Sequence, residues 1–127
     1  MQRIVGIRGA TTTEYNTSDS ILKDTRILLK EILEKNDVKN DEIISMIFTV
    51  SNDLNAAFPA AAAREMGLTD VPLICTNEIN VPGSLEKCIR VLMHTYTDKT
   101  RGSINHVYLK NAKKLRPDLV EKQGGIS

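Results

Sequence analysis

The stretch RIVGIRGATT, residues 3–12, decides how the rest of the chain is interpreted, because it begins as a strand and carries a charge. Its apolar side chains alternate, with Val5 and Ile7 on one side, and this period of two predicts a β-strand over residues 2–8. One side of such a strand is buried while the other stays open. We therefore expect a sheet with one covered face.

Arg8 lies on the other side of this strand, next to Gly6, and we expect the strand to stop in the run Gly9-Ala10-Thr11-Thr12. An arginine at a solvated strand end is the simpler interpretation. The alternative is a preformed anion pocket, in which the rigid strand end aims the guanidinium at a carboxylate and Gly6 leaves room beside it. The alternation alone does not choose between the two.

Composition and charge narrow the class of protein. The 127 residues suffice for one domain with a real core, so we interpret residues 1–127 as a single domain. The net charge of +1 gives no global basic field for nucleic acid, and aromatic residues, at 4%, are too scarce for a stacking platform. No apolar run suits a membrane span and no signal-peptide layout is present, which predicts a cytoplasmic protein. Cys75 and Cys88 lack metal-ligand spacing and are expected to be reduced thiols.

The remaining sequence mixes helical and strand patterns. Residues 18–35 carry apolar side chains at helical spacing behind Thr17, which fits an N-cap. A shorter helix is expected over residues 58–67, with Pro59 in its first turn and Gly67 as its C-cap. Further strands are predicted over residues 43–50, 71–76, 88–97 and 106–112. This order predicts an α+β fold, a mixed β-sheet with helices packed on one face.

Arg90 interrupts the apolar run 88–97, which its β-branched residues favour as a strand over a helix capped by Ser84. A charge in such a run rarely stays buried without a partner. In one interpretation, the commoner one, Arg90 points into solvent from the open face of an antiparallel sheet. In the other, the sheet holds the guanidinium rigid and aims it at an anionic ligand. Tyr108 has the parity to join Arg90 on that face.

Several other residues are candidates with simple structural alternatives. Arg64 reads alone as a solvated helix arginine, Glu78 as a structural hydrogen-bond acceptor in an uncharged loop, and Cys75 as a small packed residue. No Ser/His/Asp signature, glycine-rich phosphate loop or metal-spaced carboxylate pair occurs. This inventory is unusual for a hydrolase. It suits an anion-binding module, or an enzyme whose reaction needs shape and charge rather than a proton relay.

Several motifs together resemble the monofunctional AroH class of chorismate mutases, in register over nearly the whole chain. They are GIRGATT (6–12), AFPAAAAREM (57–66), the CxxE of Cys75 to Glu78, CIRVLM (88–93), HVYL (106–109) and LRPDL (115–119). The resemblance implies conversion of chorismate to prephenate by a [3,3] rearrangement, on the route to phenylalanine and tyrosine. It also implies a homotrimer of α+β subunits, a pseudo-α/β-barrel trimer with clefts at the subunit interfaces, and no cofactor or metal.

The resemblance further implies roles for individual residues. Arg90, Glu78 and Arg8 are the implied catalytic residues: Arg90 beside the ether oxygen of the substrate, Arg8 with Tyr108 on a carboxylate, and Glu78 with Cys75 on the hydroxyl and ring side. Other substrate contacts are implied for Phe58 and Arg64 of the neighbouring subunit, and for Leu73, Ile74, Leu115 and Arg116 in the wall and lid.

Two positions depart from the class, and two other functions stay open. Ala61 stands where members often carry a lysine, which bears on substrate affinity, and Ile74 stands where a threonine is familiar. The first alternative is a non-catalytic trimer that binds a small carboxylate, and the second is a trimeric imine or enamine hydrolase. Residues 117–127 are expected to form a mobile tail that acts as a lid.

Overall fold

The computed structural model describes residues 2–118 of the chain. Its regular elements are β1 (Arg3–Thr12), α1 (Ser18–Asn36), β2 (Ile43–Val50), α2 (Ala60–Glu65), β3 (Leu73–Asn77), β4 (Cys88–Thr97) and β5 (Val107–Tyr108). Short 3₁₀ helices cover Asn40–Glu42, Arg101–Ser103 and Lys110–Lys114. Within the described part of the chain, no helix has both the length and the apolar character needed to cross a membrane.

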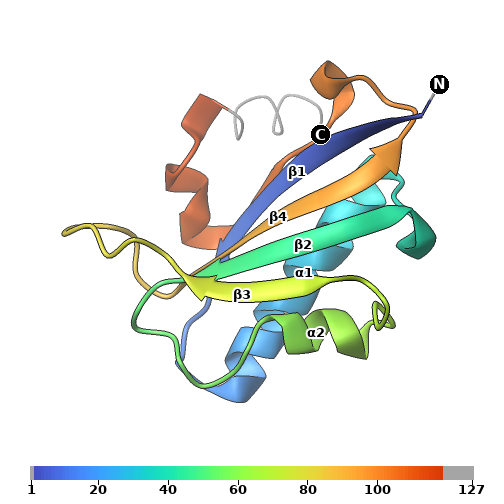
Figure 1. Ribbon diagram of the computed structural model, residues 1–127. Coiled ribbons are helices and arrows are strands. Elements are labelled where there is room, and N and C mark those ends of the chain that lie inside the picture. The colour runs from blue at the N-terminus through green and yellow to red at the C-terminus, as the bar shows by residue number, and fades with distance from the viewer. Residues whose placement is uncertain (1, 119–127) are drawn as a thin grey trace.

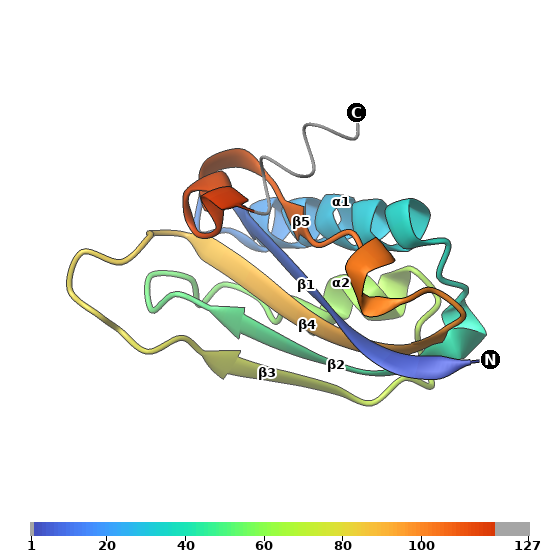
Figure 2. The same ribbon diagram turned by 90° about the horizontal axis from the view of Figure 1, so that it is seen from above.

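The five strands form one mixed sheet in the order β3-β2-β4-β1-β5. The central strand β4 runs antiparallel to both β1 and β2, whereas β3 runs parallel to β2 and β5 runs parallel to β1. Figures 1 and 2 show α1 and α2 on the same face of this sheet, with the other face uncovered. The predicted α+β architecture, a mixed sheet with helices on one face, is confirmed.

The helix α1 covers the sheet with the apolar stripe that its sequence predicts. The hydroxyl of Thr17 accepts a hydrogen bond from the Ser20 N–H at 3.2 Å, so Thr17 is the N-cap. The apolar residues of the stripe, Ile21, Leu28, Leu29 and Ile32, are fully buried. The helix therefore begins where predicted and runs one residue further, to Asn36.

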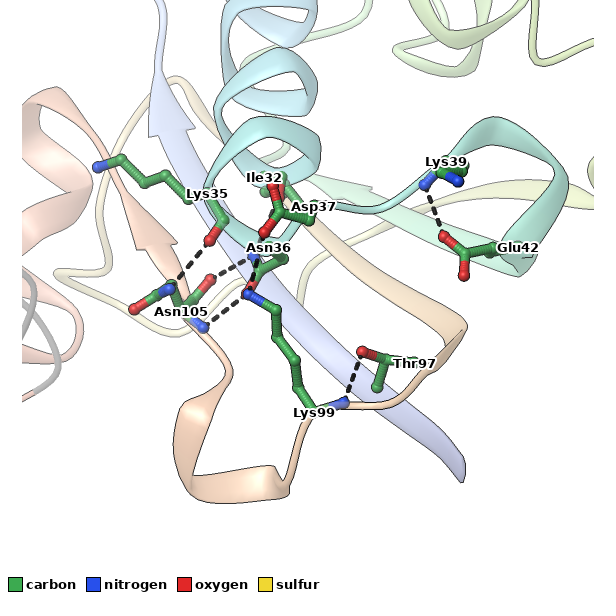
Figure 3. A network of polar contacts seen from close by, with 9 residues as sticks. All are labelled: Ile32, Lys35, Asn36, Asp37, Lys39, Glu42, Thr97, Lys99 and Asn105. Carbon is green, nitrogen blue, oxygen red and sulfur yellow. Dashed lines mark hydrogen bonds and ion pairs between the residues drawn. The ribbon is translucent and has the colours of Figure 1, made fainter. Parts of the chain in front are cut away.

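The buried Asn36 joins the end of α1 to the segment that precedes β5 (Figure 3). Its Nδ2 donates to the carbonyl oxygens of Ile32 and Asn105, both at 2.9 Å, and its Oδ1 accepts from the Asn105 N–H at 2.7 Å. Nδ2 of Asn105 in turn donates to the Lys35 carbonyl at 3.0 Å. These bonds satisfy a buried amide and hold the chain at Asn105, two residues before β5 begins at Val107.

The predicted end of β1 is wrong. The strand continues through Gly9-Ala10-Thr11-Thr12, and it pairs with β4 as far as Thr12 opposite Cys88, so Arg8 lies within the strand and does not end it. Gly9 stands there because α1 packs directly onto it: a Cβ at this position would lie 2.5 Å from Ile32 Cδ1. The sequence suggested that the strand stops at this glycine, whereas the structure uses the missing side chain for close packing.

The two shorter elements differ from their predicted bounds. α2 is shorter than 58–67, and its C-cap is Met66; Gly67 follows at φ +92°. The N–H groups of Gly67 and Leu68 then bond to the carbonyls of Arg64 and Ala63, the Schellman pattern for which glycine is favoured. β3 begins after Pro72 at the sheet edge, two residues later than predicted.

The predicted strand 106–112 is mostly wrong. Only Val107–Tyr108 pairs with β1, after which Lys110 adopts φ +51° and a 3₁₀ helix begins. The alternation of HVYLKNA reflects burial around Tyr108 and Ala112 and not an extended backbone. Of the predicted tail 117–127, residues 119–127 lie outside the described residues.

Candidate active site

Four of the predicted site residues line a single cleft of about 280 Å³: Arg8, Glu78, Arg90 and Tyr108. They come from β1, from the residue after β3, from β4 and from β5, and β2 adds Ile47 and Thr49. The cleft thus draws on four strands of the sheet and on the residue that follows β3. Along their strands, Arg8 follows the core residue Ile7 and Arg90 precedes the core residue Val91. Because side chains alternate between the two faces of a strand, both arginines point to the open face and away from the helices.

Arg90 lies at the middle of the cleft because its strand is the centre of the sheet. It is paired with Ala10 on one side and with Thr49 on the other. Its Nε is buried and lies 3.3 Å from Glu78 Oε1, as an ion pair, and has no hydrogen-bond partner within residues 2–118. The side chain is 40% exposed. Arg90 therefore lies on the open face of an antiparallel pair, as the first of the two interpretations predicts. Its guanidinium is not simply solvated, however, because it forms an ion pair with the Glu78 carboxylate.

Glu78 is fixed by both backbone and side chain. Its N–H donates to the Val50 carbonyl at 2.9 Å, which extends the β2–β3 ladder by one residue. Its Oε1 accepts a hydrogen bond from the Thr49 hydroxyl at 2.6 Å and faces Arg90 Nε. The sequence analysis missed Thr49, because a threonine in an apolar strand looks like an ordinary strand residue.

Arg8 and Tyr108 form the β1–β5 side of the cleft. The backbone N–H of Arg8 donates to His106 Nδ1 at 2.9 Å, while its side chain stays exposed. Tyr108 is 5% exposed and packs with Ala10, its register partner. His106 does not itself line the cleft; its ring nitrogen accepts from a β1 N–H just before the short β5 begins.

Leu115 and Arg116 lie close to this side without lining the cleft. Leu115 packs against the cluster that contains Tyr108. Arg116 donates from Nε and Nη2 to the two carboxylate oxygens of Asp118, at 3.1 and 2.9 Å. The hydrogen bonds to Asp118 raise the pKa of the Arg116 guanidinium above its usual range.

The other predicted contacts are not brought into this cleft within one chain. Leu73 and Cys75 alternate with Ile74 along β3 and pack against the core, whereas Ile74 lies on the open face opposite Ile47. Cys75 and Phe58 line a second cavity of about 510 Å³. Arg64 is exposed on α2. Phe58 is 70% exposed within one chain.

Cys88, two residues before Arg90, has a thiol that the charges of Arg90 and Glu78 influence. Burial raises the pKa of Cys88, and the nearby Arg90 guanidinium partly opposes this. The thiol therefore stays neutral near pH 7, which suits packing and not nucleophilic attack. Within residues 2–118, no cluster of three or more His, Cys, Asp or Glu side chains is placed to hold a metal ion.

Comparison with known proteins shows the family to which the chain belongs. The family model for chorismate mutase type I matches residues 4–119. The chain belongs to the type I chorismate mutase family. It is 47% identical to the chorismate mutase AroH of Bacillus subtilis over 117 residues, or 91% of this chain and 92% of that protein. It is 48% identical to the chorismate mutase AroH of Thermus thermophilus over 119 residues, or 93% and 98% of the two chains.

Among solved structures, a chorismate mutase from Clostridium thermocellum superposes with a TM-score of 0.86 at 61% sequence identity. The match covers 87% of this chain and 98% of the other. The shared fold therefore extends over most of the chain, and the range matched by the family model contains every residue of the cleft.

Proposed function

We propose that the chain converts chorismate to prephenate in the cleft centred on Arg90. The observation that carries this proposal is the buried Nε of Arg90, which has a carboxylate beside it but no hydrogen-bond partner among the described residues. A buried donor without an acceptor calls for an explanation, because leaving it so costs about 1–3 kcal/mol. The ether oxygen of chorismate, on which negative charge grows during the reaction, is the acceptor that fits.

The rearrangement of chorismate requires few catalytic groups of the protein. In the [3,3] rearrangement the ether C–O bond breaks while a C–C bond forms, and no atom or proton enters or leaves. Catalysis then consists of holding the enolpyruvyl arm over the ring and of stabilising the charge on the oxygen. Arg8 and Tyr108 bind a carboxylate of the dianion, and Arg90 serves the ether oxygen. Glu78 accepts from the ring hydroxyl and complements positive charge developing on the ring.

We further propose a homotrimer whose active sites lie between subunits. The open face of the sheet exposes a set of large apolar side chains in register with one another, Ile4, Tyr96, Ile47 and Ile74. Burying these residues against another copy of the chain removes an apolar patch from water. In this arrangement Phe58 and Arg64 reach the cleft of the neighbouring subunit.

The remaining wall and lid residues keep their proposed roles in substrate binding: Leu73, Ile74, Cys75, Leu115 and Arg116. Ala61, on α2, gives the mouth of the site no cation where relatives of this class often carry one, so we expect weaker substrate affinity and unchanged chemistry. Replacing Ala61 by lysine tests this through a lower KM. A place in the cytoplasm is likewise proposed from the sequence.

The test is to mix the purified chain with chorismate and to follow the loss of its diene absorbance. Prephenate is identified by acid conversion of the product to phenylpyruvate. We expect saturable turnover at low enzyme concentration. Chorismate binding without turnover would instead support the carboxylate-binding alternative, and release of ammonia from short imino acids would support the hydrolase.

A further inference from the structure

We propose that Thr49 is a positioning residue for the rearrangement, which holds one oxygen of Glu78 and so determines which oxygen meets the substrate. This inference rests on the proposed function of the cleft and deepens it. Thr49 lines the cleft from β2, directly opposite Arg90 in the β2–β4 register.

The first step of the argument concerns the two oxygens of the Glu78 carboxylate. Oε1 accepts the Thr49 hydroxyl proton at 2.6 Å and lies 3.3 Å from Arg90 Nε. A threonine hydroxyl has a single proton to donate, and here Oε1 receives it. Oε1 therefore already faces two donors of the protein. Oε2 is left as the oxygen that accepts from the ring hydroxyl of chorismate.

The second step concerns Arg90. A carboxylate beside a guanidinium tends to turn into a two-bond fork, which would occupy the donors that the ether oxygen needs. In the structure Nε keeps an ion-pair contact with Glu78 and makes no hydrogen bond to it. The short bond from Thr49 holds the carboxylate out of the fork geometry. Thr49 thus keeps Arg90 available for the transition state.

The third step concerns the stiffness of the Thr49 side chain, which suits it to hold the Glu78 carboxylate in one orientation. Its β-branched side chain is stiff about χ1, so the hydroxyl costs little entropy to orient on a strand. It is half-buried between β3 and the central strand, with Thr76 and Arg90 as its register partners. A simple structural role for the hydroxyl would affect stability, whereas the positioning role affects the chemical step.

The experiment compares Thr49→Val with Thr49→Ser in kinetics with chorismate. Valine keeps the shape and the strand preference but removes the hydroxyl, and serine keeps the hydroxyl. We expect kcat to fall about tenfold in Thr49→Val, as for loss of a hydrogen bond to a charged group, with KM changing less than about threefold. Thr49→Ser is expected to recover most of that loss. Thr76→Val, the matched control on β3, is expected to stay within about twofold of the unmodified chain.

A double variant adds a test of mechanism. In a Glu78→Ala background the valine substitution should have no further effect on kcat, because the group that Thr49 orients is gone. A Thr49→Val chain with kcat near that of the unmodified chain would overturn the proposal. So would a Thr49→Ser chain as slow as Thr49→Val, or an undiminished valine effect in the Glu78→Ala background. Failure of the proposed function is a different result, since the unmodified chain would then not consume chorismate.

Discussion

The two faces of the sheet use alternate residues of the same strands and have opposite properties. On the helix face, Phe48 and Met93 are fully buried in the core under α1 and α2. On the open face, Ile47, the residue before Phe48, and Arg90, three residues before Met93, line the cleft. Residues that stabilise the fold and residues that line the cleft therefore alternate along the same strand. Substitutions at adjacent positions should accordingly change different properties, the free energy of unfolding on the helix face and the catalytic rate on the open face.

The sharpest test of this separation is Phe48→Ala on the helix face. Phe48 has no exposed surface, and we expect the free energy of unfolding to fall by about 3–5 kcal/mol because a cavity replaces the ring. Denaturant unfolding at a fixed protein concentration measures it. The matched control is Ile47→Ala, one residue earlier on the open face and 38% exposed within one chain, for which a smaller loss is expected because only the proposed contact between subunits covers that part of the side chain. Equal losses for the two would show that the faces are not separate.

Arg90→Ala tests the same separation from the open face. We expect kcat to fall about 10²–10³-fold, as when a donor to a developing oxyanion is removed. Arg90→Lys should lose most of this activity as well, because an ammonium lacks the planar fork. Stability should change by less than about 1 kcal/mol, since the ion pair with Glu78 is partly exposed. Near-normal turnover in either variant would remove Arg90 from its proposed role.

A pair of glycines on β1 provides a test with no change of charge. Gly9 faces α1, where a Cβ would lie 2.5 Å from Ile32 Cδ1, and Gly6 faces the open side, where a Cβ would lie 3.4 Å from Leu92 Cδ1. We expect Gly9→Ala to cost about 1–3 kcal/mol through overpacking. Gly6→Ala should be neutral or stabilising by up to about 1 kcal/mol, because alanine loses less entropy. Thermal or urea unfolding measures the change in the free energy of unfolding for both variants. A smaller loss for Gly9→Ala than for Gly6→Ala would contradict the prediction.

These cases also show what the sequence could predict. Apolar periodicity placed α1, β2 and β4 within one residue of their ends, because buried stripes leave a strong pattern. A charge inside an apolar strand drew attention to Arg90 but favoured a position in solvent, and only the family resemblance implied a place beside a ligand; in the structure Arg90 lines the cleft. Arg8 was assigned to the cleft and is found there, although the expected strand end beside it was wrong. The reason is that Gly9 serves packing, which depends on a helix that approaches from elsewhere in the chain.

The parts of the site that depend on partners far apart in sequence were not predictable. Thr49 and Glu78 are separated by 29 positions and meet only because β2 and β3 pair in parallel. Cys75 carries a family motif, but its side chain has the parity of the helix face and packs against the core. Period-two alternation would have placed it there, since Ile74 takes the open position. The pairing of strands in the folded chain thus determines which side chains meet in the cleft, and neither the motifs nor the composition could predict this.

The smallest expected effect concerns Cys88, a buried thiol at the start of β4 with the same strand parity as Arg90. Burial raises its pKa above the usual 9.0, against the opposing Arg90 guanidinium. The folded chain therefore holds this proton more tightly than the unfolded chain. The resulting stability is complete below the pKa of the unfolded chain and is lost as pH rises through the pKa of the folded chain.

We expect the free energy of unfolding to decline above about pH 9 in the unmodified chain, and less steeply in Cys88→Ala, since alanine does not titrate. Urea unfolding between about pH 8 and 10 compares the two slopes, and the cavity left by alanine offsets both ends equally. Parallel slopes would mean that the thiol does not couple to folding, and that Arg90 stabilises the thiolate as fully as burial opposes it.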